Sequence, residues 1–133
     1  MILIGLSRHS VAPSDPADAV RKYYAFLEAR DYASAYAMWG DHGMASKQTF
    51  AQFADGFAHT AHTSVTVTAP VEIEGAAGSS YAEVKVDVKA ETTEGAEQRF
   101  TGSYVVRRTN DVPGATPAQL RWHFNSARLV PAH

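Results

Sequence analysis

The chain of 133 residues contains no cysteine. Disulfide bonds, a thiolate nucleophile and cysteine-ligated zinc are therefore excluded, and the redox state of its compartment is left open. No apolar run approaches the roughly 20 residues that a membrane-spanning helix requires. A glycine-rich phosphate loop, a His-Glu-x-x-His pair and a nucleophile elbow are also absent. We expect no membrane span, no metal site and no cofactor.

The chain also lacks a strong excess of charge of one sign. Its 12 Lys and Arg nearly balance its 14 Asp and Glu, which leaves a formal net charge of -2. The basic residues are scattered rather than clustered, which argues against binding to nucleic acid or to an anionic membrane surface. With 45% hydrophobic and 20% charged residues, the composition is that of a globular protein. The length suits one domain.

The first residues differ from the rest of the chain. Residues 1–6 are apolar, and Arg8 and His9 follow them. A signal peptide has its positive charge first and then about 7–15 apolar residues, so this stretch is too short and its charge comes too late. We predict a flexible tail over residues 1–13, with a leader remnant as the alternative, and a single domain over residues 14–133. The localisation stays open between exported, or periplasmic, and cytoplasmic.

The spacing of apolar residues changes once, near His62. Before it, apolar residues recur three and four positions apart, as on one face of a helix: Val20, Tyr23, Tyr24, Leu27; Tyr32, Ala35, Tyr36, Trp39; Phe50, Phe53, Ala54, Phe57. After it they alternate, as in a strand. Helices followed by strands indicate an α+β domain. We predict three N-terminal helices packed on a curved antiparallel sheet of four or more strands, a cone-like shape that can hold an internal pocket.

The first two predicted helices follow each other with almost no loop. Ser14 or Asp15 can cap the first helix, and proline at position 16 suits its first turn. We expect this helix to end near residue 30. Asp31 then caps the second helix, which we expect to end at Trp39. The pair predicts a helical hairpin.

The third predicted helix and the strands are also bounded by local signals. Gly40 suits a left-handed exit from the second helix. Thr49 and Gln52 form a capping box for the third helix, which should fade by Thr60. A bend or bulge is expected at Pro70, because proline cannot donate to a sheet. Turn residues separate four predicted strands at residues 64–74, 81–92, 99–108 and 119–130.

Alternation assigns the two faces of the predicted sheet. In the second strand, Val84 and Val86 share the helix-covered side, and Lys85 and Asp87 share the other. No predicted strand places a carboxylate on its helix-covered side. His123 falls on the polar side, where a cross-strand partner is expected. The polar side could also pair two copies, so we predict a homodimer formed through it.

Several short segments carry a family resemblance: the paired Tyr23 and Tyr24, ARDYASAY at residues 29–36, FAQF at 50–53 and WHFNSA at 122–127. With the order of the elements, they resemble the nuclear transport factor 2-like superfamily over residues 15–129. This cone-shaped α+β fold is shared by ketosteroid isomerase and SnoaL-type cyclases. The likeness is greatest to small bacterial exported or lipoprotein-type members of unknown function.

The resemblance leaves several functions open, because the superfamily includes isomerases, dehydratases, cyclases, dimerisation modules and binding domains. Its isomerases use a carboxylate base and a tyrosine-plus-acid oxyanion hole inside the cone. The corresponding strand positions here carry Val, Ala, Phe or Gly. This favours a non-catalytic small-molecule-binding or accessory domain. The alternatives are an isomerase, dehydratase or cyclase acting on an apolar cyclic substrate, and a structural dimerisation module.

Two groups of residues are candidates for a site, namely the pair Asp41 and His42 and a set of aromatic residues; a third group, His59 and His62, is examined as a metal site and rejected. Asp41 and His42 follow the second helix, and the aspartate could orient the histidine as a general base. His59 and His62 are three apart, but the helix should end between them and no third ligand lies nearby, so we expect no metal there. Aromatic residues expected between helices and sheet could line a pocket for a small apolar ligand. They are Tyr24, Tyr36, Trp39, Phe57, Tyr104 and Trp122.

Overall fold

The computed structural model describes residues 15–69, 71–76, 78–110, 116 and 120–132. The predicted tail over residues 1–13, the capping candidate Ser14 and the bend at Pro70 lie outside them. The helices are α1 (Pro16–Glu28), α2 (Tyr32–Ala37), the 3-10 turn η2 (Met44–Ser46) and α3 (Phe50–Asp55). None of the described helices is both long and apolar enough to cross a membrane.

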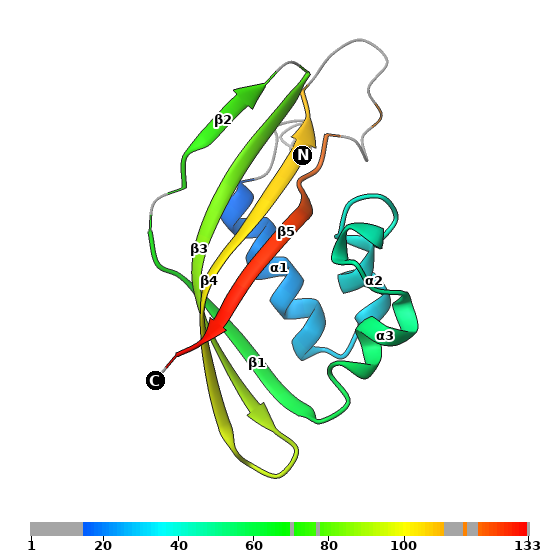
Figure 1. Cartoon of the computed structure of the whole chain (residues 1–133), viewed down its shortest axis with the longest axis vertical. Coiled ribbons are helices and arrows are strands. Elements are labelled where there is room, and N and C mark those ends of the chain that lie inside the picture. The colour runs from blue at the N-terminus through cyan, green and yellow to red at the C-terminus, as the bar shows by residue number, and fades with distance from the viewer. Residues whose placement is uncertain (1–14, 70, 77, 111–115, 117–119, 133) are drawn as a thin grey trace, which may run out of the picture.

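One antiparallel sheet follows the helices, with strands in the order β1-β3-β4-β5 and β2 also paired to β3 (Figure 1). Its strands are β1 (Thr60–Val67), β2 (Ile73–Ala76), β3 (Ser79–Thr92), β4 (Glu97–Thr109) and β5 (His123–Pro131). α1 runs behind the sheet, and α2 and α3 lie beside it (Figure 1). The predicted α+β architecture, with three helices and an antiparallel sheet, is confirmed.

Helix α1 covers the sheet with one apolar face. Its N-cap is Asp15, whose Oδ1 accepts a hydrogen bond of 2.8 Å from the backbone N–H of Ala17. Val20, Tyr23, Tyr24 and Leu27 are buried at helical spacing, and the helix contacts β1 and β3. The amphipathic pattern and the cap thus place the start of this helix as predicted, and the helix ends at Glu28, before the expected end near residue 30.

Helix α2 ends two residues before the predicted position. Trp39 leaves the helix and forms a parallel β-bridge with Phe124 of β5, in which the N–H of Gly40 donates to the Phe124 carbonyl over 2.9 Å. The left-handed exit predicted at Gly40 is wrong. It falls instead on Asp41, His42 and Gly43, with φ of 57°, 55° and 94°. A tertiary hydrogen bond therefore decides where the helix stops.

Helix α3 is also shorter than predicted. Both halves of the capping box are present, because Thr49 accepts from Gln52 N–H and the Gln52 side chain accepts from Thr49 N–H. The helix ends at Asp55 rather than near Thr60, since Thr60 already begins β1 and lies opposite Thr92 of β3. Pairing with β3 favours the extended conformation over a further helical turn.

The strands differ from prediction at their ends. The long strand expected over residues 64–74 is two strands, β1 and β2, which pair with different parts of β3. β5 begins at His123 rather than at residue 119, and the β4–β5 register shifts between Val105 and Val106. The order of strands is the predicted meander.

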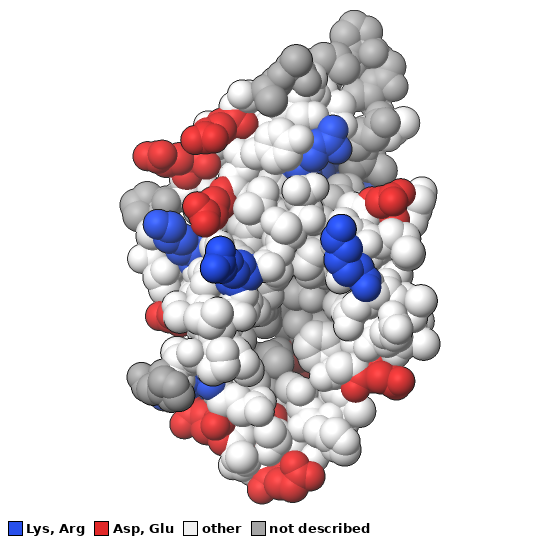
Figure 2. All heavy atoms as spheres, in the orientation of Figure 1, with Lys and Arg blue, Asp and Glu red and all other residues white. Residues whose placement is uncertain are grey.

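The two faces of the sheet are those that alternation predicts. On β3, Val84 and Val86 are completely buried, whereas Lys85 and Asp87 are exposed. The side of the sheet turned away from α1 is called the outer face. Figure 2 shows this side of the molecule together with the α2–α3 region, with charged side chains of both signs spread over it. We call the helix-covered side the inner face. No described strand places a carboxylate there, by register and alternation.

Candidate functional site

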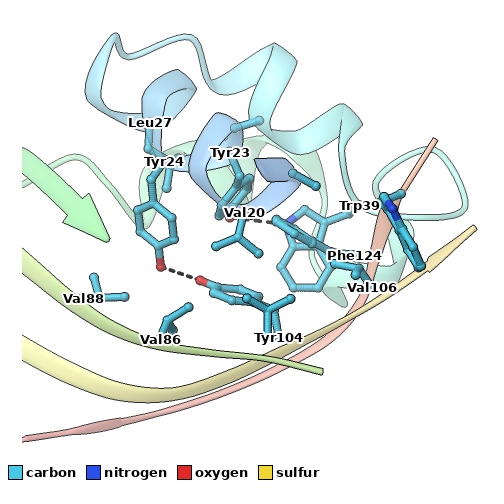
Figure 3. Packing of buried hydrophobic residues seen from close by; sticks show 14 of the residues in the cluster. Val20, Tyr23, Tyr24, Leu27, Trp39, Val86, Val88, Tyr104, Val106 and Phe124 are labelled. Atoms are coloured by element: carbon cyan, nitrogen blue, oxygen red, sulfur yellow. Dashed lines mark hydrogen bonds between the residues drawn. The ribbon is translucent and has the colours of Figure 1, made fainter. Parts of the chain in front are cut away.

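A cluster of aromatic rings fills the space between α1 and the sheet. The Tyr23 ring lies edge-on to Phe124, with centroids 4.5 Å apart, and the Tyr104 ring stacks on Phe124 at 4.9 Å. The Tyr24 and Tyr104 hydroxyls share a hydrogen bond of 2.5 Å, and Trp39 Nε1 donates to the Tyr23 hydroxyl over 3.3 Å (Figure 3). Three predicted lining residues, Tyr24, Trp39 and Tyr104, therefore meet in one cluster.

The hydroxyl groups of this cluster are poor proton donors to water. Burial raises the pKa of Tyr24 to about 12, against the lowering effect of its bond to Tyr104. Burial also raises the pKa of Tyr23 and of Tyr104, and the neighbouring tyrosines add to the effect at both. All three phenols are neutral at physiological pH. The Tyr24 and Tyr104 hydroxyls bond to each other, and the Tyr23 hydroxyl accepts from Trp39.

Two other predicted lining residues lie away from this cluster. The Tyr36 hydroxyl donates to the carbonyl of Gln48 over 2.7 Å and fastens the chain between η2 and α3. The ring of Phe57 stacks on that of Tyr32, with centroids 5.6 Å apart and an angle of 12° between planes. Both are half-buried.

Trp122, the sixth predicted lining residue, borders a large open groove. The groove has a volume of about 680 Å³ and lies between the first turns of α1 and the connection from β1 to β2. Its size falls in the range of small-molecule sites, about 300–1,000 Å³. Apart from Trp122 it is lined by Asp15, Pro16, Ala17, Arg21, Val67, Ala69, Val71, Ile73 and Arg108. We call it the Arg108–Trp122 groove.

Arg108 is the exceptional residue of this groove. On the described strands it is the only Asp, Glu, Lys or Arg that register and alternation place on the inner face. Its guanidinium lies over the Trp122 ring, 5.2 Å from the centroid, in a cation–π arrangement. Its Nε is buried and has no hydrogen-bond partner. A positive charge thus lies at the end of an otherwise apolar face.

The sequence contained the signal for Arg108. In the third predicted strand Phe100, Tyr104 and Val106 alternate as inner-face residues, and the same alternation continued by two residues reaches Arg108. The predicted strand ends at this residue, and a charged residue at a strand end does not by itself indicate a site. Continued pairing of β4 with β3, which matches Arg108 with Ser80, keeps it in the sheet.

The predicted catalytic candidates border a different, smaller groove. Asp41 and His42 are exposed and, with His123, line a hollow of about 370 Å³ beside the start of β5. Both loop residues hold left-handed backbone conformations, which are uncommon without glycine. The structure therefore brings this loop to His123, 81 positions further along the chain than His42.

His123 has a defined tautomer. Its Nδ1 lies 3.0 Å from the carbonyl oxygen of Arg121, which only accepts hydrogen bonds, so Nδ1 carries the proton. In the neutral ring Nε2 is then a proton acceptor. The cross-strand interpretation of this residue holds for the backbone, since His123 pairs with Arg107.

Of the two histidines His59 and His62, the second contacts a carboxylate. His62 Nδ1 lies 2.9 Å from a carboxylate oxygen of Glu28, and Glu28 also accepts from the N–H of Thr63. No group of three or more His, Cys, Asp or Glu residues suited to a metal ion occurs in the described part of the chain. His62 thus links the end of α1 to β1.

The arrangement of helices and sheet is shared with solved structures. A nuclear transport factor 2-like superfamily protein from Salmonella enterica subsp. enterica serovar Typhimurium str. LT2 superposes with a TM-score of 0.60 and 13% identity, covering 87% of each chain. The chain has the nuclear transport factor 2-like fold. A "putative dehydratase" of the same family from Streptomyces avermitilis superposes with a TM-score of 0.54 and 15% identity, covering 87% of this chain and 93% of that one.

These superpositions establish a common fold, and at such low identities they leave activity open. No protein-family model matches the sequence, and no curated protein matches it. Within the nuclear transport factor 2-like fold of this chain, the grooves and the side chains that line them are therefore the features that bear on function.

Proposed function

We propose that this chain is a non-catalytic binding domain for a small apolar molecule, and that the Arg108–Trp122 groove is its binding site. One observation carries the proposal. The groove has the volume of a ligand site, and its long wall consists of aliphatic residues, of which Ile73 leaves 54% of its surface exposed. A ligand in the groove would bury this exposed aliphatic surface, and that burial favours binding.

The close packing of the aromatic cluster favours the Arg108–Trp122 groove over the cluster itself as the ligand's position. The Tyr24 and Tyr104 hydroxyls bond to each other, and Trp39 donates to Tyr23. A ligand inside the cluster would have to break these bonds and displace closely packed rings. The groove needs no such rearrangement, because its walls are already apart. Binding at Trp122 therefore costs less than binding at Tyr24 and Tyr104.

The proposal is tested by titrating the protein with decan-1-ol, a neutral apolar probe, and following tryptophan fluorescence and heat. We expect saturable binding that Ile73→Asp weakens about tenfold, because a carboxylate replaces apolar contact area. Val130→Asp is the matched control, since Val130 is 48% exposed and outside the groove lining. The absence of saturable binding to the folded wild type, or equal loss in both variants, would overturn the proposal.

A catalytic role is the alternative, and one observation favours it. His123 has Nε2 available as a proton acceptor beside Asp41 and His42. The apolar inner face, however, carries no described carboxylate that could assist a reaction there. The dehydratase name of the Streptomyces structure is compatible with this alternative but, at 15% identity, does not favour it over binding.

We also propose that two copies associate through the outer face of the sheet. Near its centre this face presents small uncharged side chains on neighbouring strands, with Thr101, Ser103 and Val105 on β4 beside Ser126 on β5. Charges of both signs surround them, so the face can complement a rotated copy of itself. They include Glu72, Glu74, Glu83, Lys85, Asp87 and Arg128.

Association is tested by sedimentation velocity of the full chain at micromolar concentration. We expect a dimer, and Val105→Arg should give a monomer because two unpaired guanidinium groups would face each other. Glu94→Arg, at the turn between β3 and β4, is a control outside this face and should stay dimeric. A monomeric wild type would overturn this second proposal and leave the binding proposal unaffected.

A further inference from the structure

We infer that the ligand of the Arg108–Trp122 groove is an amphiphile, with an apolar body and one carboxylate that binds the Arg108 guanidinium. This inference rests on the proposed binding function and specifies the chemical class of its ligand. It depends on three features of the groove: the partners that Arg108 lacks, the partners that other charged groups have, and the apolar wall.

The first feature is the incomplete set of partners around Arg108. A guanidinium has five N–H donors, and a buried one is costly unless they are satisfied. Nη1 donates to the Thr109 carbonyl over a long 3.4 Å, the ring of Trp122 lies below, and Nε has no partner. No described carboxylate lies within ion-pair distance of Arg108. The Arg108 guanidinium therefore keeps N–H donors that no described group accepts from.

The second feature is that neighbouring charged groups are already engaged. Arg21, across the groove, pairs with Asp18 at 2.7 Å. The carboxylate of Asp15 caps α1 by accepting from Ala17 N–H. On the other side of the sheet, Arg107 donates to Ser79 Oγ over 2.9 Å. Arg108 is thus the charged group of the groove whose donors an incoming anion would satisfy.

The third feature is the wall that leads away from Arg108. Val67, Ala69, Val71 and Ile73 line it, and the first three are half-buried. An apolar chain along this wall would bury aliphatic surface, at about 25 cal/mol per Å². Planar guanidinium groups match carboxylates by two parallel hydrogen bonds. A ligand with a carboxylate at one end would accept hydrogen bonds from Arg108, and its hydrocarbon chain would cover the apolar wall.

Decanoate and decan-1-ol are the probes that test this inference, because they share an apolar chain and differ in the head group. Wild-type protein should bind decanoate more tightly than decan-1-ol. Arg108→Gln should weaken decanoate binding by about 10- to 100-fold, the range for charge-assisted hydrogen bonds, and change decan-1-ol binding less than about twofold. Arg108→Lys should keep part of the preference, since it retains charge without the planar fork.

Arg107→Gln is the matched control, because it makes the same change one residue earlier and on the opposite face of the sheet. It should leave both affinities unchanged. Trp122→Phe should abolish most of the fluorescence response while calorimetry still detects binding, which places the ligand beside this ring. Thermal unfolding of each variant shows that it is folded before affinities are compared.

The possible results distinguish failure of the carboxylate class from failure of the binding function. Equal binding of both probes, with no effect of Arg108→Gln, overturns the carboxylate class and leaves the binding function standing. Equal loss of decanoate binding in Arg107→Gln and Arg108→Gln shows a diffuse charge effect and also overturns the inference. Failure of both probes to bind the folded wild type overturns the proposed function itself.

Discussion

The hydroxyl groups of Tyr24 and Tyr104, 80 positions apart in the chain, meet in the core at 2.5 Å. One comes from α1 and the other from the middle of β4, so the bond joins the helical layer to the sheet. Each hydroxyl would be an unsatisfied polar group in apolar surroundings without the other. The pair therefore specifies how α1 lies on the sheet, in addition to the burial of its apolar face.

Removal of both hydroxyls of this pair is predicted to cost less than the sum of the two separate removals. Tyr24→Phe or Tyr104→Phe should each lower the free energy of unfolding by about 1–3 kcal/mol, because the remaining hydroxyl loses its partner. The double variant should cost clearly less than the sum of the single ones. Urea denaturation of the four proteins measures this. Additive costs would show that the hydroxyls do not depend on each other.

Trp122 is predicted to stabilise the fold as well as border the groove. Its side chain is 4% exposed and lies under Arg108. Trp122→Ala should lower the free energy of unfolding by about 3–5 kcal/mol, through lost burial and the cavity left behind. Chemical denaturation monitored by circular dichroism measures the change. A loss below about 1 kcal/mol would mean that the ring does not belong to the core.

Gly43 is predicted to resist substitution for two separate reasons. Its φ is +94°, and an added Cβ would lie 2.1 Å from the ring of Tyr36. Gly95, with φ of +89° and open space around it, is a matched control that has only the first problem. Gly95→Ala should cost about 1 kcal/mol and Gly43→Ala about 1–3 kcal/mol more. Similar unfolding free energies for the two variants would contradict the close packing of Tyr36.

Glu28 is predicted to make the stability depend on pH in the acid range. Hydrogen bonds from Thr63 N–H and from His62 hold the pKa of its carboxyl below the ordinary value. A group with a lowered folded pKa contributes stability above its unfolded pKa, about 4.3. That contribution is lost as the pH falls through the folded pKa.

The difference in stability between wild type and Glu28→Gln should therefore shrink as the pH falls from about 5 through the lowered folded pKa of Glu28. Thermal unfolding at several pH values measures it. Glu83→Gln removes a carboxylate from the outer face, where no described ion pair holds it, and serves as control. Parallel curves for wild type and Glu28→Gln would show that the Glu28 contacts contribute nothing.

Local signals predicted the starts of the helices better than their ends. Asp15, Asp31 and Thr49 cap the three helices as expected, because a cap is a contact between residues two or three positions apart. The ends depended on partners far along the chain. α2 stops where Trp39 bridges to Phe124, and α3 stops where Thr60 pairs with Thr92.

The candidate site was predictable only in part. Trp122 was expected to line a pocket and does border the Arg108–Trp122 groove. Arg108 follows from the alternation of β4, because it lies two residues after the buried Val106. The opposite wall, formed by Pro16 and Ala17 of α1, could not be found from the sequence. Its position depends on how α1 crosses the sheet.

By itself, the sequence determined the order of elements, the helix caps and the two faces of the sheet. These follow from spacing and from contacts within a few residues, since the backbone geometry of a helix or strand repeats regularly. Only the tertiary structure decided which aromatic rings meet, where the helices end, and that Arg108 and Trp122 close one end of a groove. Such contacts join residues far apart in the chain, and packing rather than periodicity selects them.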